Sequence, residues 1–277
     1  MTIQPGRLFR IACIVLVSIL FFLPVWWVTV SALRPQEEIF KYLSPLSLWT
    51  LWPRDASLIY MIELWQGPFA TAILNSIYIT VVTLVVGLII SAMAGFALAV
   101  MNFRFRETIF FVIVVSFLIP FDAIALPLFG ILSKANLQNT YTGLILPGIG
   151  NGLAVFLFRQ FFMGIPKEIR EAAQIDGMGW FGIFWRIYLP LSRPAIISAG
   201  LILFVFQWQA YLWPLIIAPA PEYKVAAIAI AQFADLYGVN YSLIFSAAFF
   251  ISLIPMLVLV VFQRYFTASV ASTSGKG

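Results

Sequence analysis

The feature that most constrains this chain is a series of long apolar segments. A helix needs about 20 apolar residues to cross the hydrocarbon core of a membrane. Segments of this kind lie at 8–33, 71–101, 108–132, 143–163, 195–217 and 242–266. Because lipid offers no partner to backbone N–H and C=O groups, such segments must be helical. We therefore predict an all-α polytopic membrane protein with six transmembrane helices, forming a single transmembrane domain over residues 1–277.

Composition supports a protein whose surface is covered by lipid. Hydrophobic residues make up 62% of the chain and charged residues only 10%, whereas a soluble domain has about 25% charged residues. The first apolar segment, 8–33, is longer than the apolar region of a signal peptide and contains Pro24. We therefore interpret it as an uncleaved first span.

The distribution of basic residues predicts how the chain is oriented. Lys and Arg concentrate in the cytoplasmic loops of membrane proteins. With the N-terminus inside, the basic residues divide into eleven inner and five outer ones. The inner ones are Arg7, Arg10, Arg104, Arg106, Arg159, Lys167, Arg170, Arg186, Arg193, Arg264 and Lys276, and the outer ones are Arg34, Lys41, Arg54, Lys134 and Lys224. This asymmetry predicts a multi-pass protein of a bacterial inner membrane with both termini in the cytoplasm, and it explains the net charge of +5 without a nucleic-acid partner.

Several kinds of chemistry are excluded by the residues that the chain lacks. It has no histidine and a single cysteine, Cys13, so a disulfide framework, a zinc site and a His-dependent triad are ruled out. A phosphate-binding G-x-x-x-x-G-K-[ST] loop is also missing from the sequence. We expect no catalytic residue, no metal and no cofactor bound by this chain, which is therefore not an enzyme.

The longest predicted inner loop, 164–194, has the sequence of a short helix followed by a second one. Pro166 suits the first turn of a helix, where its missing N–H costs nothing. Glu168 favours the positive end of the helix dipole, and Gly177 is placed to end the helix in a left-handed turn. A second short helix is expected over 180–188, and Pro190 and Pro194 then interrupt the chain before the fifth span.

Two interpretations of this loop remain open from helix chemistry alone. In the first, Ala172 and Ala173 leave room for the close approach of a partner protein, and Arg170 and Glu171 form ion pairs with it. In the second, the loop is an amphipathic connector that lies at the membrane surface.

A longer pattern in this loop resembles a known family. The pattern consists of Glu171-Ala172-Ala173, Asp176-Gly177, Ile187 and Leu189-Pro190. It is similar to the EAA loop of permeases from ATP-binding-cassette importers. Asn75-Ser76, Pro166-Lys167, Trp208 and the ending Arg264–Gly277 are similar to the carbohydrate branch of that family, specifically the shorter maltose-type permease subunit. In that branch the tryptophan is commonly followed by Asn-Glu, where Gln209-Ala210 stand here.

The resemblance implies a type I importer permease fold and a function. This chain would form half of the pathway for a sugar or sugar-like solute. Its partners would be a second permease subunit in a heterodimer, two ATP-binding-cassette ATPases and a periplasmic or extracellular solute-binding protein. ATP and Mg would be used by the ATPases, and the loop at 164–194 would be the coupling helix. The implied coupling residues are Arg170, Glu171, Ala172, Ala173, Asp176, Gly177, Ile187, Leu189 and Pro190.

Polar residues within the predicted spans are candidates for the solute route. They are costly in lipid and usually face a cavity or another helix. The candidates are Asp122, Asn151, Gln207, Trp208 and Gln209. For Asn151 and the glutamines, hydrogen bonding between helices is the alternative, and for Asp122 it is a position at the outer interface.

Two other classes of protein remain as alternatives. A stand-alone secondary transporter or channel would need its own energy-coupling groups within the spans, and only Asp122 qualifies. A membrane enzyme would need a catalytic constellation, which the sequence does not contain.

Overall fold

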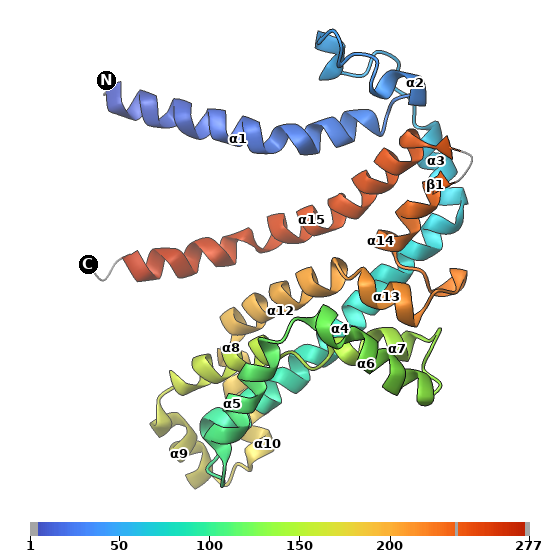
Figure 1. The fold of residues 1–277 in the computed structure, drawn as a ribbon. Coiled ribbons are helices and arrows are strands. Elements are labelled where there is room, and N and C mark those ends of the chain that lie inside the picture. The colour runs from blue at the N-terminus through green and yellow to red at the C-terminus, as the bar shows by residue number, and fades with distance from the viewer. Residues whose placement is uncertain (1–4, 236–237, 275–277) are drawn as a thin grey trace. The chain divides into compact units, whose positions relative to one another are not determined.

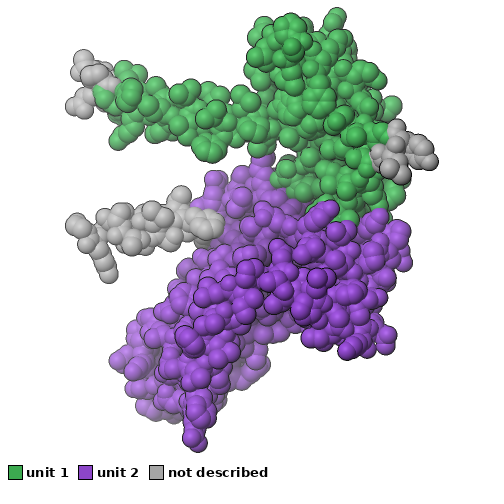
Figure 2. All heavy atoms as spheres, viewed as in Figure 1, with its two compact units in different colours: residues 1–73, 226–254 green, residues 74–225, 255–277 purple. Residues whose placement is uncertain are grey.

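The computed structural model of the chain describes residues 5–235 and 238–274, and the end of the family-like closing segment, 275–277, lies outside it. It consists of helices with one short hairpin (Figure 1). Two compact units divide the chain: unit 1 is formed by 1–73 and 226–254, and unit 2 by 74–225 and 255–277 (Figure 2). The predicted all-helical polytopic fold is confirmed.

Unit 1 contains the N-terminal helix and a region rich in aromatic residues. Its elements are α1 (Pro5–Ser31), α2 (Gln36–Ile39), η1 (Leu48–Thr50), α3 (Ile59–Gln66), α14 (Ala226–Ala229), η5 (Ile230–Phe233), β1 (Ala234–Asp235) and β2 (Gly238–Val239). The two strands pair antiparallel, with Ala234 opposite Val239. Arg34, fully buried, donates to the carbonyls of Trp49 and Trp52. These bonds hold the segment after α1 against the end of that helix.

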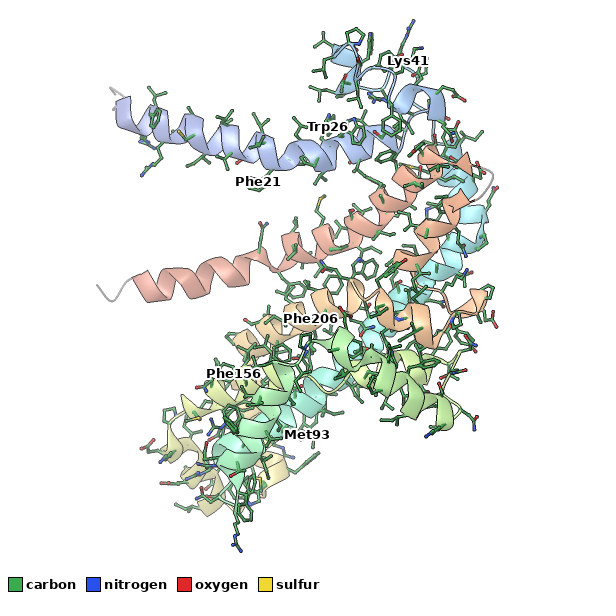
Figure 3. The ribbon with its side chains drawn as sticks, in the orientation of Figure 1. Phe21, Trp26, Lys41, Met93, Phe156 and Phe206 are labelled. Atoms are coloured by element: carbon green, nitrogen blue, oxygen red, sulfur yellow. The ribbon has the colours of Figure 1, made fainter. Side chains whose placement is uncertain are left out.

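Most of α1 is apolar and exposed. Its most apolar stretch contains no buried residue, and Phe21, for example, is 76% exposed (Figure 3). An apolar helix that is exposed along its length requires lipid or another membrane helix around it. The end of α1 does pack, because Trp27 meets Phe245 edge to face with ring centroids 5.0 Å apart.

Unit 2 contains the elements on which the functional argument depends. They are α5 (Arg106–Phe117), α6 (Phe121–Lys134), α7 (Tyr141–Ile145), η2 (Leu146–Gly148), α8 (Gly152–Met163), α9 (Lys167–Ile175), α10 (Trp180–Ile183), the π-helical turn η3 (Phe184–Tyr188), α11 (Leu189–Leu191), α12 (Arg193–Trp208), α13 (Leu212–Ile217) and η4 (Pro221–Tyr223). Helices α4 (Pro68–Val100) and α15 (Tyr241–Ser274) cross from one unit to the other. Within unit 2, α9 and α10 lie at one end and α6, α7 and α13 at the other (Figure 1).

The apolar helices of the chain fall into long single helices and bent pairs. Among the described residues, three helices, α1, α4 and α15, are each long and apolar enough to cross a membrane. Three bent pairs of helices bring the number to six by length and composition. The bend is 101° between α5 and α6, 44° between 141–148 and 152–163, and 80° between 180–191 and 193–208. The exact span boundaries stay predictions.

Proline and glycine explain two of these breaks. Pro120 precedes α6 as its N-cap, and because it has no N–H it favours a break in the helical hydrogen bonding after α5. The second break contains Gly150 and directly follows Pro147 and Gly148 at the end of η2. The predicted fifth span, 195–217, is also interrupted, because α12 ends at Trp208 and α13 begins at Leu212.

The core of unit 2 joins α4, α8, α12 and the loop at 164–194. It contains the buried side chains of Ala92, Phe96, Ala154, Phe158, Phe162, Ala173, Ile183, Phe184, Tyr188, Ala199 and Leu203, among others. Phe96 is central, since its ring lies 5.0–6.4 Å from the rings of Phe162, Trp180, Phe184 and Tyr188. The predicted inner loop is thus packed onto the helices that it connects.

Candidate functional site

The helix predicted at the start of the loop is present as α9, Lys167–Ile175. Pro166 is its N-cap, with φ −54° and ψ 134°, one position before the first helical residue. Glu168 lies in the first turn, where its charge complements the helix dipole. The helix is short and amphipathic, and Ala173 is its buried residue.

Gly177 ends α9 in the predicted left-handed turn. Its φ is +81°. The N–H of Gly177 donates to the Gln174 carbonyl at 3.0 Å, and the N–H of Met178 donates to the Ala173 carbonyl at 2.9 Å. This pair of bonds is the Schellman arrangement, which satisfies carbonyls at a helix end and requires a left-handed residue. A Cβ on Gly177 would meet no atom within 4 Å, so the turn favours glycine because of its backbone conformation alone.

The two alanines of the motif differ in burial. Ala173 is only 5% exposed and packs into the core of unit 2, whereas Ala172 is exposed. The interpretation that both leave room for a partner is therefore revised: Ala173 seats α9 on its own chain. Ala172, Glu171 and Ile175, which is 86% exposed, form the face that is open to another protein.

Arg170 points toward its own chain rather than outward. Its side chain is 18% exposed. Nη1 makes a weak 3.4 Å bond to the Val100 carbonyl at the end of α4, and Nη2 lies 3.1 Å from Glu171 Oε1. The prediction that Arg170 itself pairs with a partner protein is thus revised, because its guanidinium is directed to α4 and to Glu171.

The second half of the loop is more distorted than the single helix expected over 180–188. It consists of α10, one π-helical turn and α11. Ile187 and Leu189 are partly buried against the core, while Pro190 and the C-cap residue of α9, Asp176, are exposed. Tyr188 is 2% exposed and belongs to the core of unit 2.

One charged pair of unit 2 was not recognised from the sequence. Arg159 in α8 is 8% exposed, and its Nη2 lies 2.8 Å from both carboxylate oxygens of Glu107. Its Nε donates to the Leu98 carbonyl at 3.2 Å, and its guanidinium carbon lies 3.9 Å from the centre of the Phe110 ring. The available signal was an arginine within the predicted span 143–163, since ionisable residues in such segments are buried and paired.

Two of the predicted solute-route residues lie at the break in the fourth span. Asn151 is the N-cap of α8, and its side-chain oxygen accepts the Ala154 N–H at 3.0 Å. Gln207 approaches the same break from α12. A Cβ built on Gly148 would lie 2.6 Å from Gln207 Oε1 and 2.7 Å from Thr83 Cγ2. The side chains of Gln207 and Thr83 therefore pack against the backbone of η2 at Gly148.

The other three candidates are placed differently. Trp208 is 7% exposed, and its ring stacks on Phe204 with centroids 5.9 Å apart, so it belongs to the packing of α12. Gln209 is the exposed C-cap residue of that helix. Asp122 is exposed in the first turn of α6, where it complements the helix dipole. Of the five candidates, Gln207 and Asn151 therefore lie at the same break. Asp122 and Gln209 are exposed helix-end residues, and Trp208 is a buried packing residue.

The chain matches the family of binding-protein-dependent transport system inner membrane components over residues 87–272. It therefore belongs to that family and is a permease component of a transport system. Membership in an inner membrane family agrees with the predicted multi-pass location.

Individual relatives support this assignment. The chain is 38% identical over 204 residues to the arabinooligosaccharides transport system permease protein AraQ of Halalkalibacterium halodurans, covering 73% of each chain. It is 31% identical to the AraQ protein of Bacillus subtilis, covering 95% of this chain and 93% of that protein. The fold is similar to that of a chain in the crystal structure of a bacterial ABC transporter involved in alginate import, with a TM-score of 0.79, 21% identity and coverage of 96% and 99%.

Proposed function

We propose that this chain forms half of the pathway of an ATP-driven importer for an oligosaccharide or a related sugar-like solute, and that α9 is the element on which a cytoplasmic ATPase acts. A second permease subunit would complete the pathway, and a secreted solute-binding protein would deliver the solute. The transport function follows from the family, and the sugar class is supported by relatives named for arabinooligosaccharides.

The observation that carries the coupling proposal is the division of α9 into two faces. Ala173 fixes one face to the core, and the Gly177 turn fixes its end. The other face presents Glu171, Ala172 and Ile175 to solvent. A short helix that is anchored on one side and exposes a carboxylate beside small and apolar side chains on the other suits docking in a groove of a partner protein. Such a face agrees with the implied role of the EAA loop.

The chemistry of Glu171 defines what the partner groove would offer. Its carboxylate is 58% exposed and is held on one side by Arg170. Its remaining acceptor positions would accept a cationic side chain of the ATPase, and Ala172 beside it would permit close backbone approach. The ATP and Mg would be held by the ATPase, and this chain would contribute no group to hydrolysis. Both termini would lie on the same, cytoplasmic, side as α9.

The solute route is proposed to pass the break between η2 and α8. An amide from Gln207 and the hydroxyl-bearing side chain of Thr83 meet there. The Thr83 hydroxyl is buried and has no hydrogen-bond partner among the described residues. Amide and hydroxyl groups next to irregular backbone suit a polyhydroxylated solute, since irregular backbone at membrane depth occurs where it lines a cavity or is buried in protein.

The experiment is reconstitution with the partner subunits encoded beside this chain. The chain, a second permease and the ATPase are purified together into liposomes with the binding protein, and uptake of labelled arabinotriose is compared with uptake of an amino acid. We expect ATP-dependent uptake of the sugar and none of the amino acid. Uptake by this chain alone, driven by an ion gradient, would support a secondary transporter and overturn the proposal.

A further inference from the structure

We propose that Arg159 and Arg170 are positioning residues that clamp the C-terminal end of α4 to the coupling helix, so that α4, α8 and α9 move as one body. The proposal rests on the proposed function for the role of α9 in coupling. It assigns the two arginines a mechanical task that the motif around Glu171 does not include.

The clamp is built on carbonyl groups that a helix end leaves without partners. The last four carbonyls of a helix have no intrahelical donor, and arginine side chains can satisfy them. At the end of α4, the Leu98 carbonyl accepts from Arg159 Nε and the Val100 carbonyl accepts from Arg170 Nη1. One arginine belongs to α8 and the other to α9. Both helices on either side of the turn at 164–166 are thereby attached to α4.

The Arg159 side chain makes several specific contacts at the same time. Its Nη2 pairs with both oxygens of Glu107, and the guanidinium plane covers the ring of Phe110. Phe110 stacks in turn on Phe156, with ring centroids 6.1 Å apart. A guanidinium can make all these contacts at once because it is planar and has several donors. A lysine has the charge but could not reach the carbonyl and both carboxylate oxygens together.

Close packing reinforces the clamp along the same stretch of α4. A Cβ built on Gly95 would lie 2.6 Å from Phe158 Cβ in α8 and 3.0 Å from the Arg159 amide nitrogen. One residue later, Phe96 contacts rings of α8, α10 and η3. The last two turns of α4 are therefore fixed to the loop by polar and apolar contacts together.

The consequence is a direct connection between the coupling helix and the proposed solute route. Thr83 and Gly87, on the same helix, contact the break at Gly148 and Ile149. Fifteen residues separate Thr83 from Leu98, which is roughly 22 Å at the rise of an α-helix. If an ATPase displaced α9, α4 would move with it as a rigid helix. The contacts that Thr83 and Gly87 make with the break between η2 and α8 would then change, although this break lies that far from α9.

The test measures whether α9 and α4 keep a fixed distance. Cys13 is replaced by serine, and nitroxide labels are attached to cysteines at Ile175, on the open face of α9, and at Met93, on the exposed side of α4 (Figure 3). Pulsed electron paramagnetic resonance then gives the distance distribution for the assembled complex in nanodiscs, without nucleotide and trapped with ADP and vanadate. We expect one narrow distribution that nucleotide does not change.

Substitution of Arg159 should release the coupling helix. In Arg159→Lys we expect the distribution to broaden by about twofold and to shift on trapping, because lysine keeps the charge but loses the simultaneous contacts. Glu107→Gln removes the ion pair by a substitution at an exposed residue and should broaden the distance distribution less. This variant replaces Arg159→Lys if Arg159→Lys fails to fold. Arg104→Lys, at an exposed arginine of the same region, is the matched control and should behave as the parent.

Two results would overturn the clamp. One is a change in the Ile175–Met93 distance of the parent on trapping, which would mean that α4 does not follow α9. The other is an Arg159→Lys distribution identical to the parent's. If no ATPase purifies with the parent, the proposed function fails, and the clamp is judged separately on the partner-free chain in nanodiscs. There the parent should be narrow and Arg159→Lys broad, and equal widths would contradict the clamp.

Discussion

The N–H of Met178 donates a 2.9 Å hydrogen bond to the carbonyl of Ala173, across a turn whose apex is Gly177 at φ +81°. This bond closes the coupling loop on its buried side, since Ala173 lies in the core and Met178 is partly buried beside it. The direction in which the chain leaves α9 is therefore fixed by a single glycine.

Replacement of this glycine should damage coupling through the backbone alone. In Gly177→Val the side chain would have space but would resist the left-handed conformation by about 1–2 kcal/mol. We expect lower retention of the ATPase and lower uptake, with normal membrane insertion. Gly177→Asn should be milder, because asparagine tolerates this conformation.

The matched control for this turn is Gly179→Val. Gly179 also has open space around its Cβ position, but its φ is −73°. The control should retain the ATPase as the parent does. Equal effects of valine at both positions, measured by pull-down and uptake, would show that the left-handed turn is not what matters.

Removal of the exposed carboxylate should weaken attachment of the ATPase. A charge-assisted contact across an interface contributes about 2–5 kcal/mol when one partner is removed from a buried site, and Glu171→Ala should fall at the lower end, with a loss of about tenfold or more in affinity. Titration of purified ATPase onto the chain in nanodiscs measures this loss. Glu168→Ala, on the same helix, is the control, and an equal loss in both variants would refute a specific role for Glu171.

The close approach of α4 and α8 predicts a stability effect at Gly95. Alanine normally stabilises a helix relative to glycine by about 0.5–1 kcal/mol. At Gly95 the added methyl would overlap Phe158, so we expect a net loss of about 1–3 kcal/mol. Thermal unfolding in detergent measures the difference. Gly130→Ala in α6 meets nothing within 4 Å and should unfold at or above the parental temperature; a destabilisation equal to that at Gly95 would be contrary to the packing argument.

Substitutions of two solute-route candidates, Trp208 and Gln207, should have different effects, the first on stability and the second on uptake. Trp208→Ala removes a buried stacked ring and should destabilise the chain by about 3 kcal/mol or more. Gln207→Leu keeps the volume near η2 but removes the amide, so it should lower uptake while the unfolding temperature stays near that of the parent. Uptake at the parental rate in Gln207→Leu would place the route elsewhere.

The local chemistry of the coupling helix could be predicted from sequence because its signals are short-range. Pro166 at the start, Glu168 in the first turn and Gly177 at the end each act through backbone geometry within a few residues. The long apolar spans α1, α4 and α15 were predictable for a similar reason, since length and hydropathy decide them.

The tertiary partners could not be predicted because they lie far apart in the chain. Arg159 is separated by 52 residues from Glu107, and Arg170 by 70 from Val100. The position of Arg159 within a predicted span indicates burial but does not name its partner, and the local pattern around Arg170 is that of an ordinary cation of an inner loop. The inward position of Ala173 and the burial of Trp208 were missed for the same cause, since a helix face is defined only by what packs against it.

The central claim is that an ATPase binds the open face of α9, and site-specific crosslinking tests it most directly. A photo-reactive amino acid is introduced at Ala172 in the complete complex, with Trp52 in the segment after α1 as the comparison site, both exposed. We predict that the Ala172 site gives a crosslinked product containing the ATPase and that the Trp52 site gives none. An intact complex in which Ala172 fails to crosslink to the ATPase, or in which Trp52 does so instead, would contradict the account.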